Sequence, residues 1–395
     1  LGEIIIEGNE HTDRTVILRE LGMQVGDLFN YEKMDQAWDT LEDIGYFAFV
    51  DMEYDEDDEG QVTWRIVVEE DLTTAYGPLV RYDRRYKYRL GAWLEENNLR
   101  GKGEVFKASA AFLYAQRAEV SWYRPWLFNV EGLETTVRLH GQHADFVFRP
   151  TRHRQYQGDL EVRWIFRAPF FARAGVNFGQ DDYRDRYTWA LPDRGEGAGP
   201  QAEFLPGQQT RTALSFALGL DTRDNLWYPG RGVMIEAGAR HWQSGDFDSY
   251  TETRLDARFY VPMPVGQHIL AVRGSGRRTD GPPHLDNVLF YGGPETIRGY
   301  RFGQLEGDEG YLLSLEYRIP LFMMPISPRG EMVGVGLHAF ADAGDAWYEG
   351  ADAGRALQSY GAGIHLNLDT LQLRFEAAKP REGDWRFEFM DVFNF

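Results

Sequence analysis

The chain has 395 residues, of which 43% are hydrophobic and 14% aromatic, with 43 glycines and no cysteine. The missing cysteine excludes disulfides, thiolate nucleophiles and cysteine metal sites, and no stretch approaches the roughly 18 consecutive apolar residues of a transmembrane helix. The formal charge of −20 argues against nucleic acid as a partner, because phosphate binding needs clustered Lys and Arg.

The charge is concentrated at the N-terminal end. Residues 1–75 carry 21 acidic and 4 basic side chains, a net of −17, which leaves 41 acidic and 38 basic side chains in the remainder, a net of −3. This contrast predicts an acidic, water-exposed domain and a second part in a different solvent. Acidity favours solubility first and a cationic partner second. No signal peptide precedes the first strand, so we expect a mature or trimmed chain.

The first 72 residues predict a small α+β domain. Apolar and polar residues alternate in its strands, and one apolar stripe recurs at helical spacing. Two helices on one face of a small sheet form a complete two-layer unit. In chain order we expect a strand at Ile4–Ile6, a helix from a cap at Thr12 or Asp13 through Leu21, a helix with the stripe Met34, Trp38, Leu41 and Gly45, and strands at Phe47–Tyr54 and Val62–Val68.

Metal sites find little support in the sequence. The nine histidines show no metal-ligand spacing. The acidic run Asp55–Glu59 could bind Ca²⁺, but a solvated hairpin tip explains it better. We therefore expect no cofactor and no metal.

From about Thr73 the pattern changes to long alternating strands. Their length of about 9–13 residues suits a tilted bilayer crossing, whereas strands of soluble sheets are mostly about 5–6 residues long. We count sixteen segments, which predict a sixteen-stranded antiparallel transmembrane β-barrel at 73–395; a large soluble β-sandwich or propeller is the alternative. The segments begin near residues 75, 86, 104, 118, 134, 155, 171, 210, 233, 250, 268, 311, 333, 358, 371 and 385.

The connections between these segments alternate in length. Those after strands two, four, six, ten, twelve and fourteen are tight or contain proline, as at Arg167–Pro169 and Pro262–Pro264. Two others are long, Pro192–Gln209 and Thr279–Gly310. Short turns belong to the periplasmic side of such barrels and long loops to the outside, which fixes the expected orientation.

Three stretches resemble the BamA/TamA superfamily of outer-membrane assembly factors. Residues 3–70 resemble its POTRA domain through Gly8-Asn9, the turn from Gly45 to Val50, and Val68-Glu69. The second stretch, Gly292–Tyr300, is similar to the Arg-Gly-aromatic loop motif of the family, with Ile297, Arg298, Gly299 and Tyr300 in the motif positions. The resemblance implies a loop that folds back into the lumen.

In the family the loop arginine contacts acidic residues of the inner wall, and the sequence offers two. Alternation turns Leu315 and Ala341 toward lipid, so Glu316 and Asp342 point inward. A buried guanidinium needs such partners, because an unpaired charge away from water is costly. A solvated loop arginine with two ordinary lumen carboxylates is the alternative.

The third stretch is the C-terminus, which is similar to the signal by which outer-membrane proteins are recognised. Aromatic residues occupy one face of the last strand, although Asp391 and Met390 depart from the usual pattern. A block from Asp221 to Gly232 also resembles a turn of the family. The aromatic positions are Phe387, Phe389, Phe393 and Phe395.

The resemblance implies insertion of other chains into the bacterial outer membrane, with the POTRA domain in the periplasm. The first strand contains Gly77 and Pro78, next to Arg81, Arg84 and Arg85. Glycine weakens a strand and proline removes a ladder donor, which predicts an imperfect seam with the last strand; a linker kink is the other interpretation. An incoming strand could pair with that open edge.

Other functions stay open. A secretion pore for polypeptide or lipid is one, although a second POTRA domain and a plug helix are not visible. A membrane anchor and export module of a larger surface protein is another, and a diffusion porin a third. No nucleophile motif supports an enzyme. Expected partners are unfolded outer-membrane protein clients, the lipid bilayer, and periplasmic or lipoprotein partners of the POTRA domain.

Overall fold

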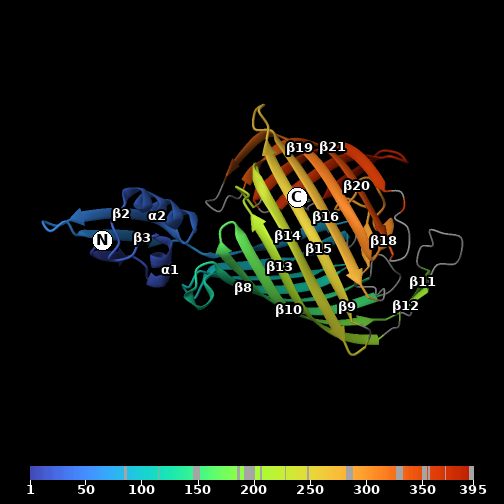
Figure 1. Cartoon of the computed structure of the whole chain (residues 1–395), viewed down its shortest axis with the longest axis horizontal. Helices are drawn as coiled ribbons and strands as arrows, with labels where there is room; N and C mark the ends of the chain where they lie inside the picture. The colour runs from blue at the N-terminus through green and yellow to red at the C-terminus, as the bar shows by residue number, and fades with distance from the viewer. Residues whose placement is uncertain are drawn as a thin grey trace.

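The computed structural model describes most of the chain. The described residues are 1–83, 87–113, 115–145, 152–184, 187–190, 201–204, 207–226, 228–246, 249–281, 288–325, 332–348, 354, 356–369 and 371–390. They form a small N-terminal domain and a large curled sheet (Figure 1). Among these residues no helix has the length and apolar character needed to cross a membrane.

The N-terminal domain is a two-layer α+β unit, as the sequence predicts. Its mixed sheet has the order β1-β3-β2, with β1 parallel and β2 antiparallel to β3. Alternate residues of β3 are buried, among them Trp64 and Ile66, and they pack against Ile17 and Leu41 of the helices. The elements are β1 (Glu3–Glu7), α1 (Arg14–Glu20), α2 (Tyr31–Asp43), β2 (Phe47–Glu56) and β3 (Val62–Glu70).

Local sequence signals explain where the two helices begin and end. Asp13, one of the two predicted caps, accepts the Thr15 amide at 3.0 Å, and this hydrogen bond lowers the pKa of the Asp13 carboxyl. Asn30 caps α2 in the same way. Gly45 follows α2 at φ 66°, a left-handed conformation that favours glycine.

Sixteen of the other described strands form one antiparallel sheet that curls into a barrel (Figure 1). The sequence prediction of the fold is confirmed, and each predicted start lies within three residues of the observed one. The strands are β4 (Thr74–Asp83), β5 (Lys87–Leu99), β6 (Glu104–Phe112), β7 (Gln116–Arg124), β8 (Leu133–Asp145), β9 (Arg152–Arg167), β10 (Phe170–Tyr183), β13 (Gly207–Asp221), β14 (Gly232–Ser244), β15 (Tyr250–Pro262), β16 (Ile269–Asp280), β19 (Glu309–Pro325), β20 (Met332–Trp347), β21 (Leu357–Asp369), β22 (Leu371–Pro380) and β23 (Arg386–Met390).

Side chains alternate between the outer face and the lumen. On β19, Leu313 and Leu315 are exposed on the outside, whereas Glu316 is 1% exposed. On β20, Leu337 is exposed and Asp342 is buried. An apolar outer band around a polar interior is the arrangement of a membrane barrel.

The two rims of the barrel differ. We call the rim next to the N-terminal domain the proximal rim and the opposite one the distal rim (Figure 1). Two short hairpins that the sequence did not predict, β11 with β12 and β17 with β18, lie at the distal rim (Figure 1). The hairpin strands are β11 (Tyr187–Ala190) with β12 (Gln201–Phe204) and β17 (Leu289–Tyr291) with β18 (Leu305–Gly307); a 3₁₀ turn, η1 (Leu127–Asn129), lies between β7 and β8.

The N-terminal domain contacts the barrel at the turn between β5 and β6. Asn98 donates its side-chain amide to the Thr12 hydroxyl at 2.9 Å, and the Asp13 amide donates to the Gly101 carbonyl at 2.8 Å. Within the domain, Glu70 accepts the His11 amide at 2.8 Å and also the Thr12 amide, which holds the segment that contacts the barrel. The domain is therefore docked on the proximal rim by hydrogen bonds as well as by the chain itself.

Candidate functional site

The loop after β16 returns into the lumen from the distal rim. Its hairpin of β17 and β18 is followed inward by a turn at Gly292, whose φ is 107° and where a Cβ would lie 2.3 Å from the Arg301 carbonyl oxygen. Gly299 has φ 83°, and its Cβ would lie 3.1 Å from that of Ala378 on the wall. These glycines allow the close approach that brings Arg298 against the strands.

Ile297 and Tyr300 anchor the loop on either side of the arginine. Ile297 is fully buried, and Tyr300 is 6% exposed. Both pack in an apolar cluster with Leu289, Leu312 and other residues at the distal end of the lumen. The Tyr300 hydroxyl also donates to the Gln358 carbonyl of β21 at 2.7 Å. The loop thus has a core of its own inside the barrel.

Arg298 lies fully buried among carboxylates of the inner wall. Its Nε and Nη2 donate to the two oxygens of Asp342 at 2.7 and 2.8 Å, a bidentate pair. Its Nη1 donates to Glu316 at 3.0 Å and to Glu376 at 3.2 Å. The guanidinium carbon lies 3.6 Å from the ring centroid of Phe340, a cation–π contact.

A second layer of charges surrounds this pair. The Nε of Arg318 donates to Glu316 at 2.8 Å. Arg374 donates to Glu316 and forms an ion pair with Glu376 at 3.1 Å. Three guanidinium groups, from Arg298, Arg318 and Arg374, therefore face the carboxylates of Glu316, Asp342 and Glu376. Charges of both signs in equal number compensate one another in a site that excludes water.

The geometry brings together the loop motif and both carboxylates that the sequence singled out. Sequence reasoning missed four members of the surroundings, Glu376, Arg374, Arg318 and His338, all 3% exposed or less. Alternation along Leu371, Leu373 and Phe375 places Arg374 and Glu376 inward, so that signal was present. What the sequence does not supply is the register that puts β19, β20 and β22 residues side by side.

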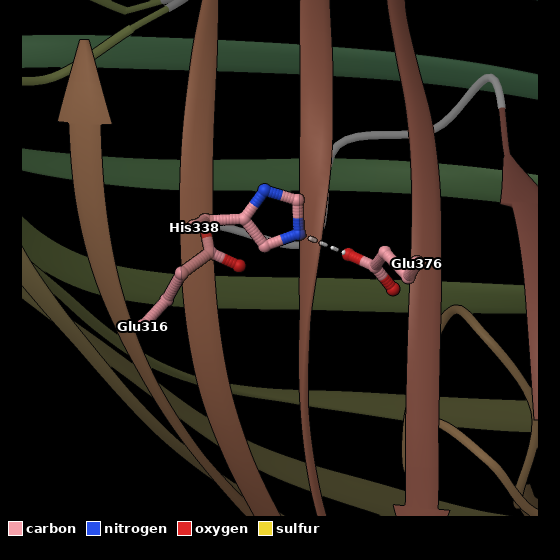
Figure 2. A group of neighbouring side chains, drawn as sticks. All are labelled: Glu316, His338 and Glu376. Carbon is pink, nitrogen blue, oxygen red and sulfur yellow. Dashed lines mark hydrogen bonds and ion pairs between the residues drawn. The ribbon is translucent and has the colours of Figure 1, made fainter. Parts of the chain in front are cut away.

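Glu316, His338 and Glu376 also meet the geometric requirement for a metal site. Each offers one ligand atom, and these atoms lie within 4.8 Å of one another; Figure 2 shows the imidazole of His338 directed at Glu376. Both oxygens of Glu316 already accept from guanidinium groups. A dication would have to displace these donors and lie beside three arginines, so we assign the group to the ion-pair network.

The two ends of the sixteen-stranded sheet are β4 and β23. In the described part of the chain no ladder joins them, and β23 pairs with β22 over five residues. Gly77 and Pro78 lie within β4, opposite Trp93 and Ala92 of β5. Pro78 has no N–H and so removes one donor from this strand.

The structure describes two of the four C-terminal phenylalanines that the sequence singled out. Phe387 and Phe389 lie on β23 with exposed side chains, and the Phe389 ring lies 4.8 Å from that of Phe375 on β22. Phe393 and Phe395, like Asp391, lie outside the described residues. Arg84 and Arg85, which the sequence placed near the seam, also lie outside them.

Comparison with known families matches both parts of the chain. The model of the Omp85 superfamily domain matches residues 98–395, and the model described as the surface antigen variable number repeat, the POTRA model, matches residues 1–71. Two curated relatives are outer membrane protein assembly factors BamA. The one from Nitratidesulfovibrio vulgaris is 23% identical over 80% of this chain and 41% of its own length, and the one from Neisseria meningitidis serogroup B is 24% identical over 95% and 51%.

Solved structures show the same fold. BamA from Haemophilus ducreyi lacking POTRA domains 1–3 has a TM-score of 0.75 at 17% identity, covering 98% of this chain and 82% of that one. CdiB from Acinetobacter baumannii has a TM-score of 0.61 at 12% identity, covering 98% and 73%. The chain spans about half or less of the length of the curated relatives. It belongs to the Omp85 superfamily of outer-membrane β-barrel proteins.

Proposed function

We propose that this protein inserts or assembles other β-barrel proteins in the outer membrane, through the edge between β4 and β23. The observation that carries the proposal is that, in the part of the chain that the structure describes, no ladder joins the two sheet ends and β23 pairs with its neighbour over five residues. An unpaired strand edge presents N–H and C=O groups to which a client strand can add by β-augmentation. The names of the curated relatives support assembly as the general role.

The ion pairs around Arg298 in the lumen hold the barrel wall beside this edge in a fixed arrangement. The loop motif Ile297–Tyr300 is tied to β19, β20 and β22 through Arg298, and the Gly299 amide donates to Glu388 of β23 at 3.3 Å. The network therefore holds the β23 side of the edge, whereas β4 lies at the other end of the sheet order. A barrel held firmly on one side of the edge can open at β4 without losing its overall shape. In this proposal the motif stabilises the barrel and takes no part in covalent chemistry.

We assign residues 1–72 to a POTRA domain in the periplasm and residues 73–395 to the barrel. The free edge of β2 offers a second site for β-augmentation, by clients or by periplasmic and lipoprotein partners. Phe389, Phe393 and Phe395 would form the C-terminal signal for the protein's own insertion. Residues 1–72 expressed alone should fold in plain buffer, whereas residues 73–395 should require detergent; a monodisperse 73–395 fragment without detergent would contradict the assignment.

Passage through the lumen is the second candidate, as in a secretion pore or the export module of a larger surface protein. The wall opposite the network favours it, since a cavity of about 230 Å³ there is lined by charged residues such as Arg173, Glu252 and Arg277. The Arg298 loop, however, fills part of the lumen. Opening a path would require displacing a buried ion-pair network, which is costly.

A disulfide across the seam separates the two candidates, and the absence of native cysteine makes the experiment clean. One cysteine is placed on β4 and one on β23, and several combinations are scanned for oxidation. The control joins Ala92 and Ala110, which are register partners on β5 and β6. Insertion of a radiolabelled outer-membrane protein into liposomes is measured with and without reductant.

An edge mechanism predicts that the seam disulfide abolishes insertion and that reductant restores it, whereas the control disulfide has no effect. A substrate that passes through the lumen never needs the edge. Equal insertion with the seam oxidised and reduced would therefore eliminate the edge mechanism and favour the pore.

A further inference from the structure

Tyr228 brings the turn between β13 and β14 into the lumen from the proximal rim. Its side chain is 7% exposed and packs with Tyr260 and Ile269. The turn itself is well organised, because Asn225 accepts the Tyr228 amide at 2.7 Å and Asp224 accepts the Gly230 amide at 2.9 Å. The sequence singled out this block, and the proposed function gives it no role.

A continuous series of hydrogen bonds leads from Tyr228 to the loop arginine at the other side of the lumen. The Tyr228 hydroxyl lies 3.1 Å from Nε2 of His365 on β21, and Nδ1 of His365 lies 3.1 Å from Nδ1 of His338 on β20. Nε2 of His338 lies 2.8 Å from Oε1 of Glu376. The same oxygen accepts from Nη1 of Arg298 at 3.2 Å.

With both histidines neutral, the chemistry of these groups gives the direction of every bond. Glu376 accepts from Arg298 and forms an ion pair with Arg374, so it is a carboxylate and His338 donates to it from Nε2. The neutral His338 then accepts at Nδ1, which requires His365 to donate from its own Nδ1. His365 accepts at Nε2, and the Tyr228 hydroxyl donates there. The three donors between Tyr228 and Glu376 point toward the distal loop, and Arg298 donates to Glu376 from the loop itself.

Two glycines leave the space that the rings occupy. At Gly336 a Cβ would lie 2.4 Å from Nε2 of His365, and at Gly363 a Cβ would lie 2.9 Å from Cε1 of His338. Real Cβ atoms do not come closer than about 3.0 Å to another heavy atom. Glycine at these two positions therefore leaves room for the two histidine rings. Both ring nitrogens of each histidine take part in hydrogen bonds.

We propose that Tyr228, His365 and His338 are positioning residues that couple the proximal turn to the distal loop by holding Glu376 against Arg298. Each hydrogen bond orients the next group, so loss of the Tyr228 hydroxyl loosens the loop, and loss of the Arg298 contact loosens the turn. Such coupling is reciprocal by thermodynamic necessity. It operates inside the barrel and does not depend on how the protein handles clients.

The test measures hydrogen–deuterium exchange of the purified barrel in detergent for two peptides, residues 292–304 of the loop and residues 222–232 of the turn. Tyr228→Phe removes only the hydroxyl. Exchange of the loop peptide should rise about fivefold, the change expected from one net hydrogen bond. Glu376→Gln should raise exchange of the turn peptide in return.

Tyr317→Phe is the matched control. Tyr317 lies on β19, and its hydroxyl pairs with Nδ1 of His268 at 2.8 Å, so the substitution also breaks a Tyr–His bond. Exchange of both peptides should stay at the wild-type value in this variant. If Tyr228→Phe changes the turn peptide alone, the coupling is wrong and Tyr228 is merely a local packing residue.

Two substitutions at His338 test the direction of the series. A glutamine amide can reach the position of Nε2 and keep the donor to Glu376, whereas an asparagine carbonyl can replace only the Nδ1 acceptor. His338→Gln should therefore preserve loop protection and His338→Asn should lose it, with both variants folded by heat-modifiability on a gel. Equal exchange of the loop peptide in the two variants would overturn the proposal. If Tyr228→Phe does not fold, the two His338 variants still test the proposal.

Discussion

The strands β19–β22 and the strands β4 and β23 belong to one sheet, yet they are held in opposite ways. β19 and β20 pair over sixteen residues, and their lumen faces meet the buried charges around Arg298. β23 pairs over five residues, and in the described chain β4 has no partner on its outer side. Among the described ladders of the barrel, the one between β22 and β23 is the shortest.

Short strand pairing at one end of the sheet suits a barrel that opens there without unfolding, as the proposed function requires. Local opening needs little free energy where backbone pairs are few and more where pairs are many and side chains are buried. The ion-pair network resists rearrangement because each member, once separated from its partners, would be a buried charge without compensation. The sheet ends carry no comparable cluster among the described residues.

The largest effect should come from reversing the charge of the loop arginine. Arg298→Glu would place a fourth carboxylate against Glu316, Asp342 and Glu376, and removing one partner from a buried pair costs about 3–5 kcal/mol. We expect loss of heat-resistant migration on a gel and a lower free energy of unfolding in urea. The control is Arg301→Glu, an exposed arginine three positions along the same loop. Normal migration of Arg298→Glu would show that the lumen contact contributes little.

A methyl group under the arginine should have a smaller effect. In Gly361→Ala the new Cβ would lie 2.2 Å from the Ala377 carbonyl oxygen and 2.5 Å from Cζ of Phe340. The Phe340 ring that supports Arg298 would have to move, at a cost of about 1–3 kcal/mol for overpacking. Gly276→Ala is the control, because the nearest atom to its Cβ is 3.9 Å away. Equal urea midpoints for the two variants would mean that this part of the barrel wall tolerates repacking.

Amide hydrogen exchange should show directly that β23 opens more easily than β20. We expect backbone amides of β23 to exchange at least about tenfold faster than those of β20, a difference of roughly 1.4 kcal/mol in opening free energy. Hydrogen–deuterium exchange with peptide resolution measures both strands in one sample. Similar protection of the two strands would remove the contrast on which the edge mechanism depends.

The smallest effect concerns Glu70, which holds the His11–Thr12 segment inside the N-terminal domain. Burial alone would raise the pKa of Glu70, but hydrogen bonds from Thr12 and His11 outweigh it and lower the pKa below the ordinary 4.5. The stabilisation is therefore complete above about pH 4.5 and is lost as the pH falls through the lowered value. Glu70→Gln should cost about 1 kcal/mol at neutral pH and flatten the acid limb of domain melting followed by tryptophan fluorescence. An unchanged acid limb would contradict this role.

Alternation made most of the barrel predictable from the sequence. A strand with one face toward lipid and one toward the lumen must alternate over its whole length, so strand positions and the inward direction of Glu316 and Asp342 follow from the residues. The small domain is predictable for the same reason, since the buried face of β3 repeats every second residue.

Contacts across strands were less predictable. Glu376 lies three strands from Glu316, and only the register of β19 to β22 brings both to Arg298. The two histidines are separated by 27 positions, and nothing in their spacing indicates that the rings meet. The hairpin of β17 and β18 was missed because strands of three residues give too short a pattern to recognise.

The docking of the N-terminal domain has a mechanical consequence. Three residues separate β3 from β4, and Asn98 and Gly101 tie the domain to the β5–β6 turn. The domain is therefore attached to the first three barrel strands at two points: the chain between β3 and β4, and the hydrogen bonds to the β5–β6 turn. A rotation of the domain would therefore act first on β4, the strand at the sheet end.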